Sequence, residues 1–360
     1  MNATAVSSFS CVHIVGCGLL GTSIGLALSQ RGVTVTLEDA SPAAVNLARD
    51  YGAGTVRKND SPAPQLVVVA TPPDVTGSVV TASLTAFPEA TVIDVASVKK
   101  LVYSETQGDT ARFMGTHPMA GRERGGAVSA RSDLFTGRPW VLCEGDEIRR
   151  AQVRGFVQEL GGIPVDMGAA EHDQTVALVS HLPQVVASIS AARLGDASPE
   201  ALSLAGAGIR DVTRIAASDP ALWVQILSAN SDAVIPHLRA VTDNLESLIA
   251  ALQDLSVSGA RATIASTLQQ GVAGVSQLPG KHGISSELAS LLVVIDDTPG
   301  QLAKLLTQLG DWGINLEDLR LEHSPGANIG FAELSVSTNV VGSMEQKLAE
   351  AGWKISGETE

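Results

Sequence analysis

The stretch VHIVGCGLLGTSIGLAL, residues 12–28, decides the fold of the first half of the chain. An apolar run leads into glycines at Gly16, Gly18 and Gly21, and a second apolar segment of helix-forming residues follows. In such a strand–turn–helix unit the first glycine permits a tight turn, the second lets a pyrophosphate approach the backbone, and the third allows close helix–strand packing. The pattern predicts a dinucleotide-binding turn, and the alternative is a glycine turn that serves packing only.

An acidic pair follows the second predicted strand, about 20 positions after this turn. Glu38 and Asp39 stand where a carboxylate can accept hydrogen bonds from both ribose hydroxyls. Such a carboxylate repels a 2′-phosphate and no arginine follows it directly, so the pattern favours NAD over NADP. We expect the cofactor to contact Gly16, Gly18, Leu19, Leu20, Gly21, Asp39, Thr71 and Pro72.

Short apolar runs alternate with helical patterns up to residue 170, which is typical of parallel βαβ units. The predicted strands are residues 12–16, 33–39, 65–71, 91–96, 112–118, 139–145 and 162–168. We therefore expect a Rossmann-type, doubly wound α/β domain over residues 1–170 and an all-α domain over residues 171–283, whose last part, from residue 258, is a connection with some helix. The order βαββαβ predicts a ferredoxin-like α+β module over residues 284–360.

Composition limits the partners. The 360 residues carry a formal net charge of −14, which argues against nucleic acid or an anionic membrane as the main partner. The 3 cysteines are too scattered for a disulfide framework or a metal knuckle, so a reducing compartment is expected. No basic leader precedes the first strand and no apolar run reaches the length of a membrane span, so the sequence predicts a cytoplasmic protein.

A heptad-like stripe runs through residues 235–252 of the helical region. Its apolar members recur at alternating steps of three and four and are Leu238, Val241, Leu245, Leu248 and Leu252. Such a stripe belongs either to an ordinary core-facing helix or to a helix that packs against a second subunit.

Three polar segments stand where strands or helices end: DVASVKK (94–100), GTHPMAG (115–121) and RDVTRIAASDPALW (210–223). Ligands of doubly wound sheets bind outside the carboxyl ends of the strands, so Ser97 and His117 are expected near the nicotinamide. Each has a structural alternative, because Ser97 could cap a helix and His117 could bond to the backbone of its turn.

A second pair of histidines lies on one predicted helix of the all-α region. His172 and His181 are nine positions apart, which places them about 180° out of phase on a regular helix and excludes a two-histidine metal site. Pro183 is expected to kink this helix, and no other cluster has the spacing of metal ligands.

These segments carry a family resemblance. GCGLLGTSIG, DVASVK, THPMAG, HDQTVALVSHLPQ and RDVTRIAASDPALW resemble, in order and wording, the prephenate dehydrogenase family, and the resemblance covers residues 10–255. It implies NAD-dependent oxidative decarboxylation of prephenate to 4-hydroxyphenylpyruvate in tyrosine biosynthesis. The tail resembles an ACT domain, a small module that binds amino acids and often accompanies enzymes of amino-acid synthesis.

The resemblance also implies roles for single residues. His117 looks like the acceptor of the substrate's hydroxyl proton, Ser97 like its orienting partner, and Arg214 like the ligand of a substrate carboxylate. By the same matching, further pocket residues would be His181, Glu123, Asp211 and Trp223, with the last two reaching the pocket from a partner subunit of a homodimer.

One position departs from the family pattern. Many relatives read His-Leu-Pro-His in the active-site helix, whereas this chain has Gln184 at the last position, which bears on the choice between prephenate and arogenate and on tyrosine feedback. In the tail, Asp297 and Asn315 match the places where ACT domains hold an amino acid such as tyrosine. The alternative is a tail that serves dimer packing only.

Two other functions compete with this interpretation. A β-hydroxy-acid dehydrogenase usually relies on a lysine in its helical domain, and residues 171–255 contain none. A non-catalytic sensor of nucleotide and amino acid would be expected to lose its site residues, yet Ser97, His117 and Arg214 are all present.

Overall fold

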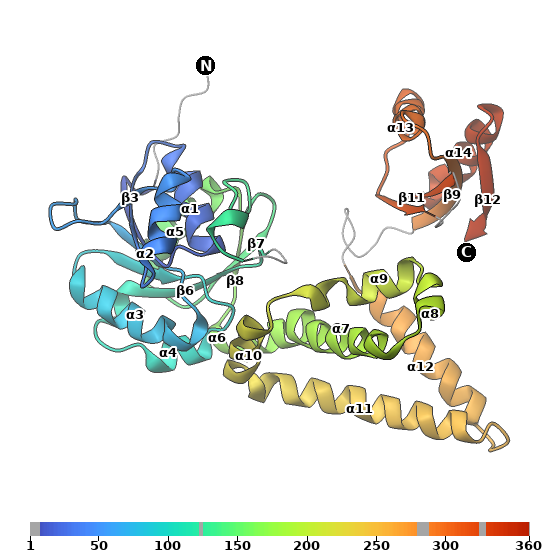
Figure 1. The fold of residues 1–360 in the computed structure, drawn as a ribbon, viewed down its shortest axis with the longest axis horizontal. Coiled ribbons are helices and arrows are strands. Elements are labelled where there is room, and N and C mark those ends of the chain that lie inside the picture. The colour runs from blue at the N-terminus through green and yellow to red at the C-terminus, as the bar shows by residue number, and fades with distance from the viewer. Residues whose placement is uncertain (1–7, 122–124, 279–287, 324–328, 360) are drawn as a thin grey trace. The chain divides into compact units, whose positions relative to one another are not determined.

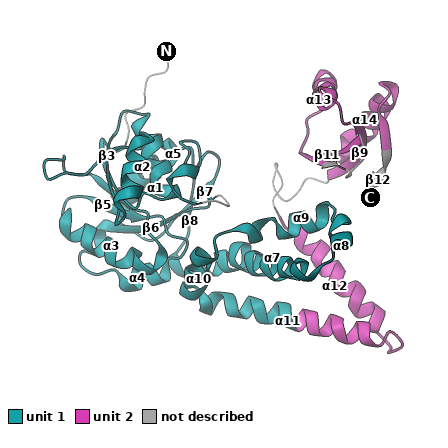
Figure 2. Cartoon of the chain, viewed as in Figure 1, with its two compact units in different colours: residues 1–242 teal, residues 243–360 magenta. Residues whose placement is uncertain are grey.

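The computed structural model describes residues 8–121, 125–278, 288–323 and 329–359. The chain forms two compact units, residues 1–242 and residues 243–360 (Figure 2). The division falls inside one long helix, α11 (Ser231–Gln253).

An eight-stranded sheet forms the centre of the first unit (Figure 1). Its strands are β1 (Cys11–Val15), β2 (Thr34–Glu38), β3 (Thr55–Val56), β4 (Leu66–Val69), β5 (Thr91–Asp94), β6 (Phe113–Pro118), β7 (Pro139–Leu142) and β8 (Ile163–Asp166). Their spatial order is β3-β2-β1-β4-β5-β6-β7-β8, which confirms the Rossmann-type prediction. The order reverses between β1 and β4, and a ligand crevice is expected at their carboxyl ends.

Helices complete this α/β part of the unit: α1 (Leu19–Ser29), α2 (Pro42–Asp50), α3 (Pro73–Ala86), α4 (Lys100–Glu105) and α5 (Glu147–Glu159). One apolar cluster packs α1, α2 and α5 against the sheet, and a second packs α3 and α4 against it. The central strand β4 is apolar throughout because the two clusters bury its two faces, and every one of its residues is buried.

Two details of the sheet differ from the sequence prediction. The two-residue strand β3 was not predicted, because so short a run carries no periodic signal. The pairing of β6 with β7 is antiparallel, whereas the pattern predicted parallel units throughout. A parallel return usually needs a crossover helix, and the described part of the β6–β7 connection holds only the 3₁₀ turn Ala127–Ser129.

The helical part of the first unit begins with one continuous helix in three segments: α6 (Ala169–Val176), a π-helical stretch Ala177–His181, and α7 (Leu182–Ala192). It continues through α8 (Pro199–Ser203), α9 (Ala207–Thr213), the 3₁₀ turn Arg214–Ala217, α10 (Pro220–Ala229) and the start of α11. The π-helical stretch ends two residues before Pro183, which has no N–H to donate and was expected to disturb the helix.

This π-helical stretch corrects the prediction that His172 and His181 occupy opposite faces. Each π turn takes up one residue more than an α turn, so the phase calculated for a regular helix does not hold across it. Both imidazoles are buried, and the charges of both would act on His117.

The same helix corrects the expectation that no segment has the length of a membrane span. Residues 169–196 form a helix of 28 residues that is long and apolar enough, by length and composition alone, to cross a bilayer. It carries the buried polar side chains His172, Asp173 and His181, whose partners lie on other elements of the unit. Only 28% of its apolar window is buried within the part of the chain that the structure describes, yet these three buried side chains attach the helix to the sheet and to the rest of the helical region.

The second unit contains the end of α11, then α12 (Ala260–Val275) and a four-stranded sheet with two helices. These elements are β9 (Leu288–Asp296), α13 (Gln301–Asp311), β10 (Asp318–His323), β11 (Ile329–Ser337), α14 (Thr338–Glu350) and β12 (Lys354–Thr359). All pairings are antiparallel, in the order β10-β11-β9-β12, which confirms the ferredoxin-like prediction. The segment predicted as a connection is mostly the 16-residue helix α12.

The heptad-like stripe lies on α11, and its residues are not all buried. Leu238 packs against a small cluster of buried residues, but Leu245 and Leu252 are 53% and 56% exposed. An ordinary core-facing helix would bury all of these positions. The core interpretation is therefore wrong for the carboxyl-terminal half of the stripe.

Candidate active site

A long groove of about 1800 Å³ in the first unit gathers most of the predicted site residues. It follows the carboxyl ends of β1, β4, β5 and β6 and is also lined by the π-helical stretch, α7 and α10. The predicted residues that line it are Gly16, Gly18, Leu19, Leu20, Asp39, Thr71, Pro72, Ser97, His117, His181, Gln184, Arg214 and Trp223.

The glycine turn at one end of the groove fits a pyrophosphate. Gly16 has φ +104°, and a Cβ there would lie 2.4 Å from the carbonyl oxygen of Ala70 on the neighbouring strand. A Cβ on Gly21 would lie 1.9 Å from the carbonyl oxygen of Gly16. A Cβ on Gly18 would meet nothing within 4 Å, so this residue, directly before α1, faces open space. The first and third glycines therefore serve packing, and the second leaves room for phosphate at the helix N-terminus.

Asp39 is built into this turn. Its carboxylate accepts hydrogen bonds from the N–H of Cys17 at 2.6 Å and of Ser41 at 2.8 Å, which fixes it between the glycine turn and the start of α2. A carboxylate held there is suited to the ribose hydroxyls of a dinucleotide. Glu38 is more exposed, and its Oε2 lies 3.3 Å from Nε2 of the buried His13.

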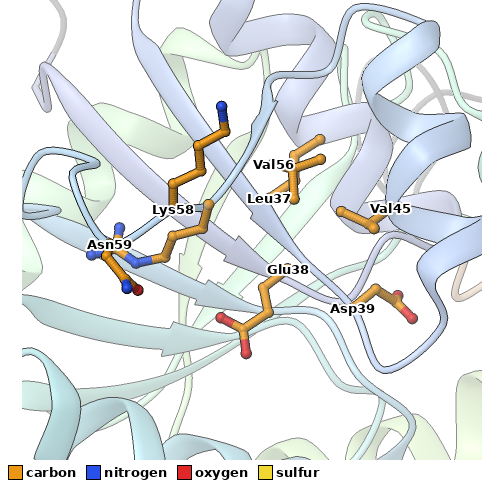
Figure 3. A pocket seen from close by; sticks show the side chains of 8 residues that line it. Leu37, Glu38, Asp39, Val45, Val56, Lys58 and Asn59 are labelled. Atoms are coloured by element: carbon orange, nitrogen blue, oxygen red, sulfur yellow. The ribbon is translucent and has the colours of Figure 1, made fainter.

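Two basic residues approach the same end of the groove from the loop after β3. Arg57 and Lys58 line a small pocket together with Glu38 and Asp39. Figure 3 labels the last three of these side chains around it. The guanidinium of Arg57 stacks 4.6 Å above the ring of Phe87. No arginine directly follows the acidic pair in the sequence, and the pairing of β2 with β3 brings these two cations to it from about 20 residues further on.

His117 lies in a chain of hydrogen bonds that crosses from the sheet to the helical region. Its Nδ1 is 2.8 Å from Nε2 of His172, and Nδ1 of His172 is 2.8 Å from Oδ1 of Asp173. Asp173 also accepts hydrogen bonds from the N–H of Lys99 at 2.8 Å and of Lys100 at 2.9 Å. The alternative in which His117 bonds to the backbone of its own turn is therefore wrong.

A buried ion pair lies behind this chain. The ammonium of Lys99 contacts the carboxylate of Asp94, and both side chains are fully buried. The ammonium also donates to the carbonyl oxygen of Thr116 at 2.6 Å, and Thr116 directly precedes His117. Burial holds the pKa of His117 well below its ordinary value of 6.5, and the positive charge of Lys99, with any charge on His172 or His181, lowers it further. His117 is therefore a neutral imidazole at neutral pH.

His181 is also neutral and presents a donor. Its Nδ1 lies 3.2 Å from Nδ2 of Asn230, whose amide N–H groups can only donate, so Nδ1 accepts and Nε2 carries the proton. Burial lowers the pKa of His181 to about 4. The ring of Trp223 packs edge to face against His181, with 5.9 Å between the ring centroids. Trp223 therefore reaches the groove within its own chain, whereas the resemblance implied that it comes from a partner subunit.

The remaining groove residues take the following places. Ser97 is half-buried and does not cap a helix, because α4 begins at Lys100 with Lys99 as its N-cap residue. Arg214 opens the 3₁₀ turn after α9. Gln184 is 6% exposed, and its Nε2 lies 3.4 Å from Oγ of Ser188. The roles assigned to these side chains remain predictions.

Other predicted residues lie apart from the groove lining. Gly21 is buried beneath the turn, Asp211 is exposed on α9, and Asp297 and Asn315 belong to loops of the second unit. Glu123 lies outside the described residues. Among the described residues no group of three or more His, Cys, Asp or Glu side chains could hold a metal ion.

Sequence reasoning missed the contribution of His172, Asp173 and Lys99. His172 was set aside on the assumption of a regular helix, and Lys99 was noted only as part of a polar segment. A signal was available: HD at 172–173 is an adjacent acid and imidazole in a helix whose other face is apolar. Only the fold shows that this pair meets His117.

A Rossmann turn with a ribose-binding acid, a neutral imidazole in the same groove and an attached helical region define a nicotinamide-dependent dehydrogenase. Family models narrow this class. The model for the prephenate dehydrogenase nucleotide-binding domain matches residues 24–163, and that for the prephenate dehydrogenase dimerization domain matches residues 168–270. The chain belongs to the prephenate dehydrogenase family and is an NAD-dependent oxidoreductase.

Individual relatives agree with this assignment. The chain is 32% identical to a probable prephenate dehydrogenase, NovF, of Streptomyces niveus, over 94% of this chain and 98% of that protein. It is 32% identical to a cyclohexadienyl dehydrogenase of Zymomonas mobilis, over 68% and 89% of the two chains. The crystal structure of Aquifex aeolicus prephenate dehydrogenase with hydroxyphenyl propionate and NAD⁺ is 27% identical, with a TM-score of 0.65 over 75% of this chain and 99% of that one.

The glycine turn predicts opposite effects for two substitutions. Gly18→Ala adds a methyl group to open space, so the protein should keep its unfolding midpoint while its affinity for NAD falls by about tenfold or more. Gly21→Ala drives a methyl group into the carbonyl oxygen of Gly16, so it should lower the unfolding midpoint itself. Thermal unfolding and NAD titration of both variants check this, and equal NAD affinity in Gly18→Ala and the parent protein would contradict it.

Proposed function

We propose that the protein converts prephenate to 4-hydroxyphenylpyruvate and carbon dioxide with reduction of NAD⁺. The observation that carries the proposal is a neutral imidazole, His117, at the carboxyl edge of the sheet in the groove that also holds the glycine turn. A hydroxyl that becomes a carbonyl needs an acceptor for its proton, and a neutral imidazole is suited to accept it. Family membership supports the same reaction.

The residues of the groove divide the chemistry as follows. NAD⁺, when bound along the glycine turn, accepts hydride from the ring carbon that bears the hydroxyl. His117 accepts the hydroxyl proton as the C–O bond gains double-bond character. The ring carboxylate leaves as carbon dioxide, the electron pair of its C–C bond enters the ring, and His117 returns the proton to the phenolate oxygen. No net proton is released, so a base that holds one proton briefly is sufficient.

Three further side chains are proposed to bind the substrate. Arg214 offers a guanidinium that can bind a carboxylate through two hydrogen bonds. His181, as a donor at Nε2, can bind an oxygen of the substrate, and Ser97 can orient the hydroxyl toward His117. All three line the groove with His117.

Arogenate is the alternative substrate, and Gln184 is the residue that bears on the choice. It is buried in the groove wall where many relatives carry histidine, and an amide donates and accepts hydrogen bonds but carries no charge. Arogenate has an ammonium group where prephenate has a ketone. The amide of Gln184 can donate to the ketone oxygen or accept from the ammonium, so this residue is compatible with both substrates. We favour prephenate because both family models are those of prephenate dehydrogenase.

The activity can be tested by following NADH absorbance with each substrate. Prephenate and NAD⁺ should give turnover, and His117→Asn should reduce kcat by about 100-fold or more with little change in the KM for NAD⁺. An acceptor must be unprotonated, so activity is lost as pH falls through the pKa of His117, and the acid limb should lie below pH 6.5. Absence of turnover with both substrates would refute the proposed function.

We propose that the protein is a homodimer that packs through its long helices. The family model over this region is that of a dimerization domain. On α11, the apolar side chains of Leu245, Ile249 and Leu252 share one face and are each more than half exposed within the chain. A second copy is the occupant that the family model indicates.

Charge placed on this face should separate the subunits. Leu245→Glu with Leu252→Glu buries two carboxylates in the proposed interface, so light scattering should give a mass near 37.1 kDa instead of twice that value. Asn244→Glu with Gln253→Glu adds the same charge to exposed positions of α11 outside the stripe and should leave the dimer intact. A dimeric Leu245→Glu, Leu252→Glu variant would count against this interface.

We propose that the ferredoxin-like module binds an amino acid such as tyrosine and regulates the enzyme. Asp297 follows the carboxyl end of β9, whereas Asn315 precedes the amino end of β10. Both strands are antiparallel to β11 and so run in the same direction, which puts these residues at opposite ends of the sheet. A site that uses both residues must take them from two copies of the module.

Calorimetric titration of tyrosine into the whole protein tests this proposal. Asp297→Ala and Asn315→Ala should each weaken tyrosine binding by about tenfold. His117→Asn should leave this binding unchanged, which separates the module from the groove. Tyrosine binding that is lost only in His117→Asn would place the ligand in the groove instead.

The compartment follows from the thiols. Cys11, Cys17 and Cys143 are all free and buried. We propose that the enzyme works in the reducing cytoplasm, which suits a protein whose cysteines are unpaired.

A further inference from the structure

In the series of hydrogen bonds from His117 through His172 to Asp173, the donor and acceptor of each bond can be worked out by starting at Asp173. Asp173 accepts hydrogen bonds from the backbone N–H groups of Lys99 and Lys100, so these two donors favour its ionised form. Burial opposes ionisation of Asp173, but the hydrogen bonds from His172 and these N–H groups outweigh it and hold its pKa below the ordinary value. Asp173 therefore contributes acceptors only.

An acceptor at one end sets the tautomer of each ring in turn. Oδ1 of Asp173 lies 2.8 Å from Nδ1 of His172, so this nitrogen carries the proton. With Nδ1 as the site of its one ring proton, His172 has a lone pair on Nε2, and this nitrogen lies 2.8 Å from Nδ1 of His117. Nδ1 of His117 must be the donor of that hydrogen bond, and Nε2 of His117 is left without a proton.

We propose that His172 and Asp173 are positioning residues that hold His117 in its Nδ1–H tautomer, so that Nε2 meets the substrate as an acceptor. This inference rests on the proposed function for its catalytic consequence, although the tautomer itself is independent of any substrate. Neither positioning residue lines the groove, so both act through His117.

Burial of these hydrogen bonds explains why His117 keeps one tautomer. His172 is 0% exposed and Asp173 1% exposed, so water does not compete for their hydrogen bonds. In the opposite arrangement both rings would carry their protons on Nε2. Nδ1 of His172 would then face the carboxylate of Asp173 without a proton. In a dry site that arrangement is costly, because a buried acceptor then faces another acceptor.

The first experiment reads the tautomer directly in the wild-type protein without substrate. Long-range ¹H–¹⁵N spectra of protein labelled at histidine distinguish a protonated from an unprotonated ring nitrogen, and the signals missing from His117→Asn assign that ring. We expect His117 with its proton on Nδ1 and Nε2 unprotonated at pH 7. A proton on Nε2 of His117, whether the ring is neutral or charged, would overturn the inference.

The second experiment uses a matched pair of substitutions at the buried position 172. In His172→Gln the side-chain oxygen can accept from Nδ1 of His117 and the amide N–H can donate to Asp173, so the direction of the chain is preserved. In His172→Leu neither bond forms. Both variants lose the imidazole, but only the glutamine variant can hold the tautomer of His117. We therefore expect kcat to be about 100-fold lower in the leucine variant than in the glutamine variant, with similar KM values for NAD⁺.

The two arms separate failure of this inference from failure of the proposed function. Equal kcat values in the glutamine and leucine variants, with both folded by their unfolding midpoints, would overturn the positioning role. If the leucine variant does not fold, the wild-type spectrum decides. If the wild-type protein turns over neither prephenate nor arogenate, the proposed function fails, while the spectrum still tests the tautomer.

Discussion

The carboxylate of Asp173 is the contact on which the arrangement of the site depends. This carboxylate accepts hydrogen bonds from the backbone N–H groups at the start of α4 and from the ring of His172. The backbone carbonyl of Asp173 accepts a further hydrogen bond from the side chain of Asn230. One residue thus joins the loop after β5, the helix α6 and the residue that orients His181. Together with the hydrogen bond between His172 and His117, these contacts connect the sheet edge to the helical wall of the groove.

This contact also explains which parts of the site the sequence could predict. The glycine turn and the acid after β2 are local signals, since strand, turn and helix follow one another within about 30 residues, and the structure has them where the pattern predicted. His117 was predicted from its place after a strand. His172 was not, because its relation to His117 depends on a π-helical stretch and on packing across 55 residues of sequence.

The sheet shows the same division between local and distant information. Alternating apolar runs predicted seven of its strands, but nothing local indicated that β7 would pair antiparallel with β6. The basic residues Arg57 and Lys58 beside the acidic pair were missed for a similar reason, since they reach that pocket only through the pairing of β2 with the two-residue strand β3. Periodicity identifies elements, whereas their neighbours are set by the sheet order.

The buried polar groups around His117 are costly for the fold, which argues that they serve the chemistry. Asp94 and Lys99 are fully buried, and a buried ion pair is often no more stabilising than apolar residues of the same volume. A structural role alone would be filled as well by leucine and methionine. Lys99, however, places a positive charge beside Thr116 and His117, where it disfavours protonation of the imidazole, and its backbone N–H anchors Asp173. Burial is the main reason that the pKa of His117 is low, and Lys99 lowers it further while it also holds the carboxylate that directs the lone pair of His117. This double use is a reason to retain an ion pair in the core.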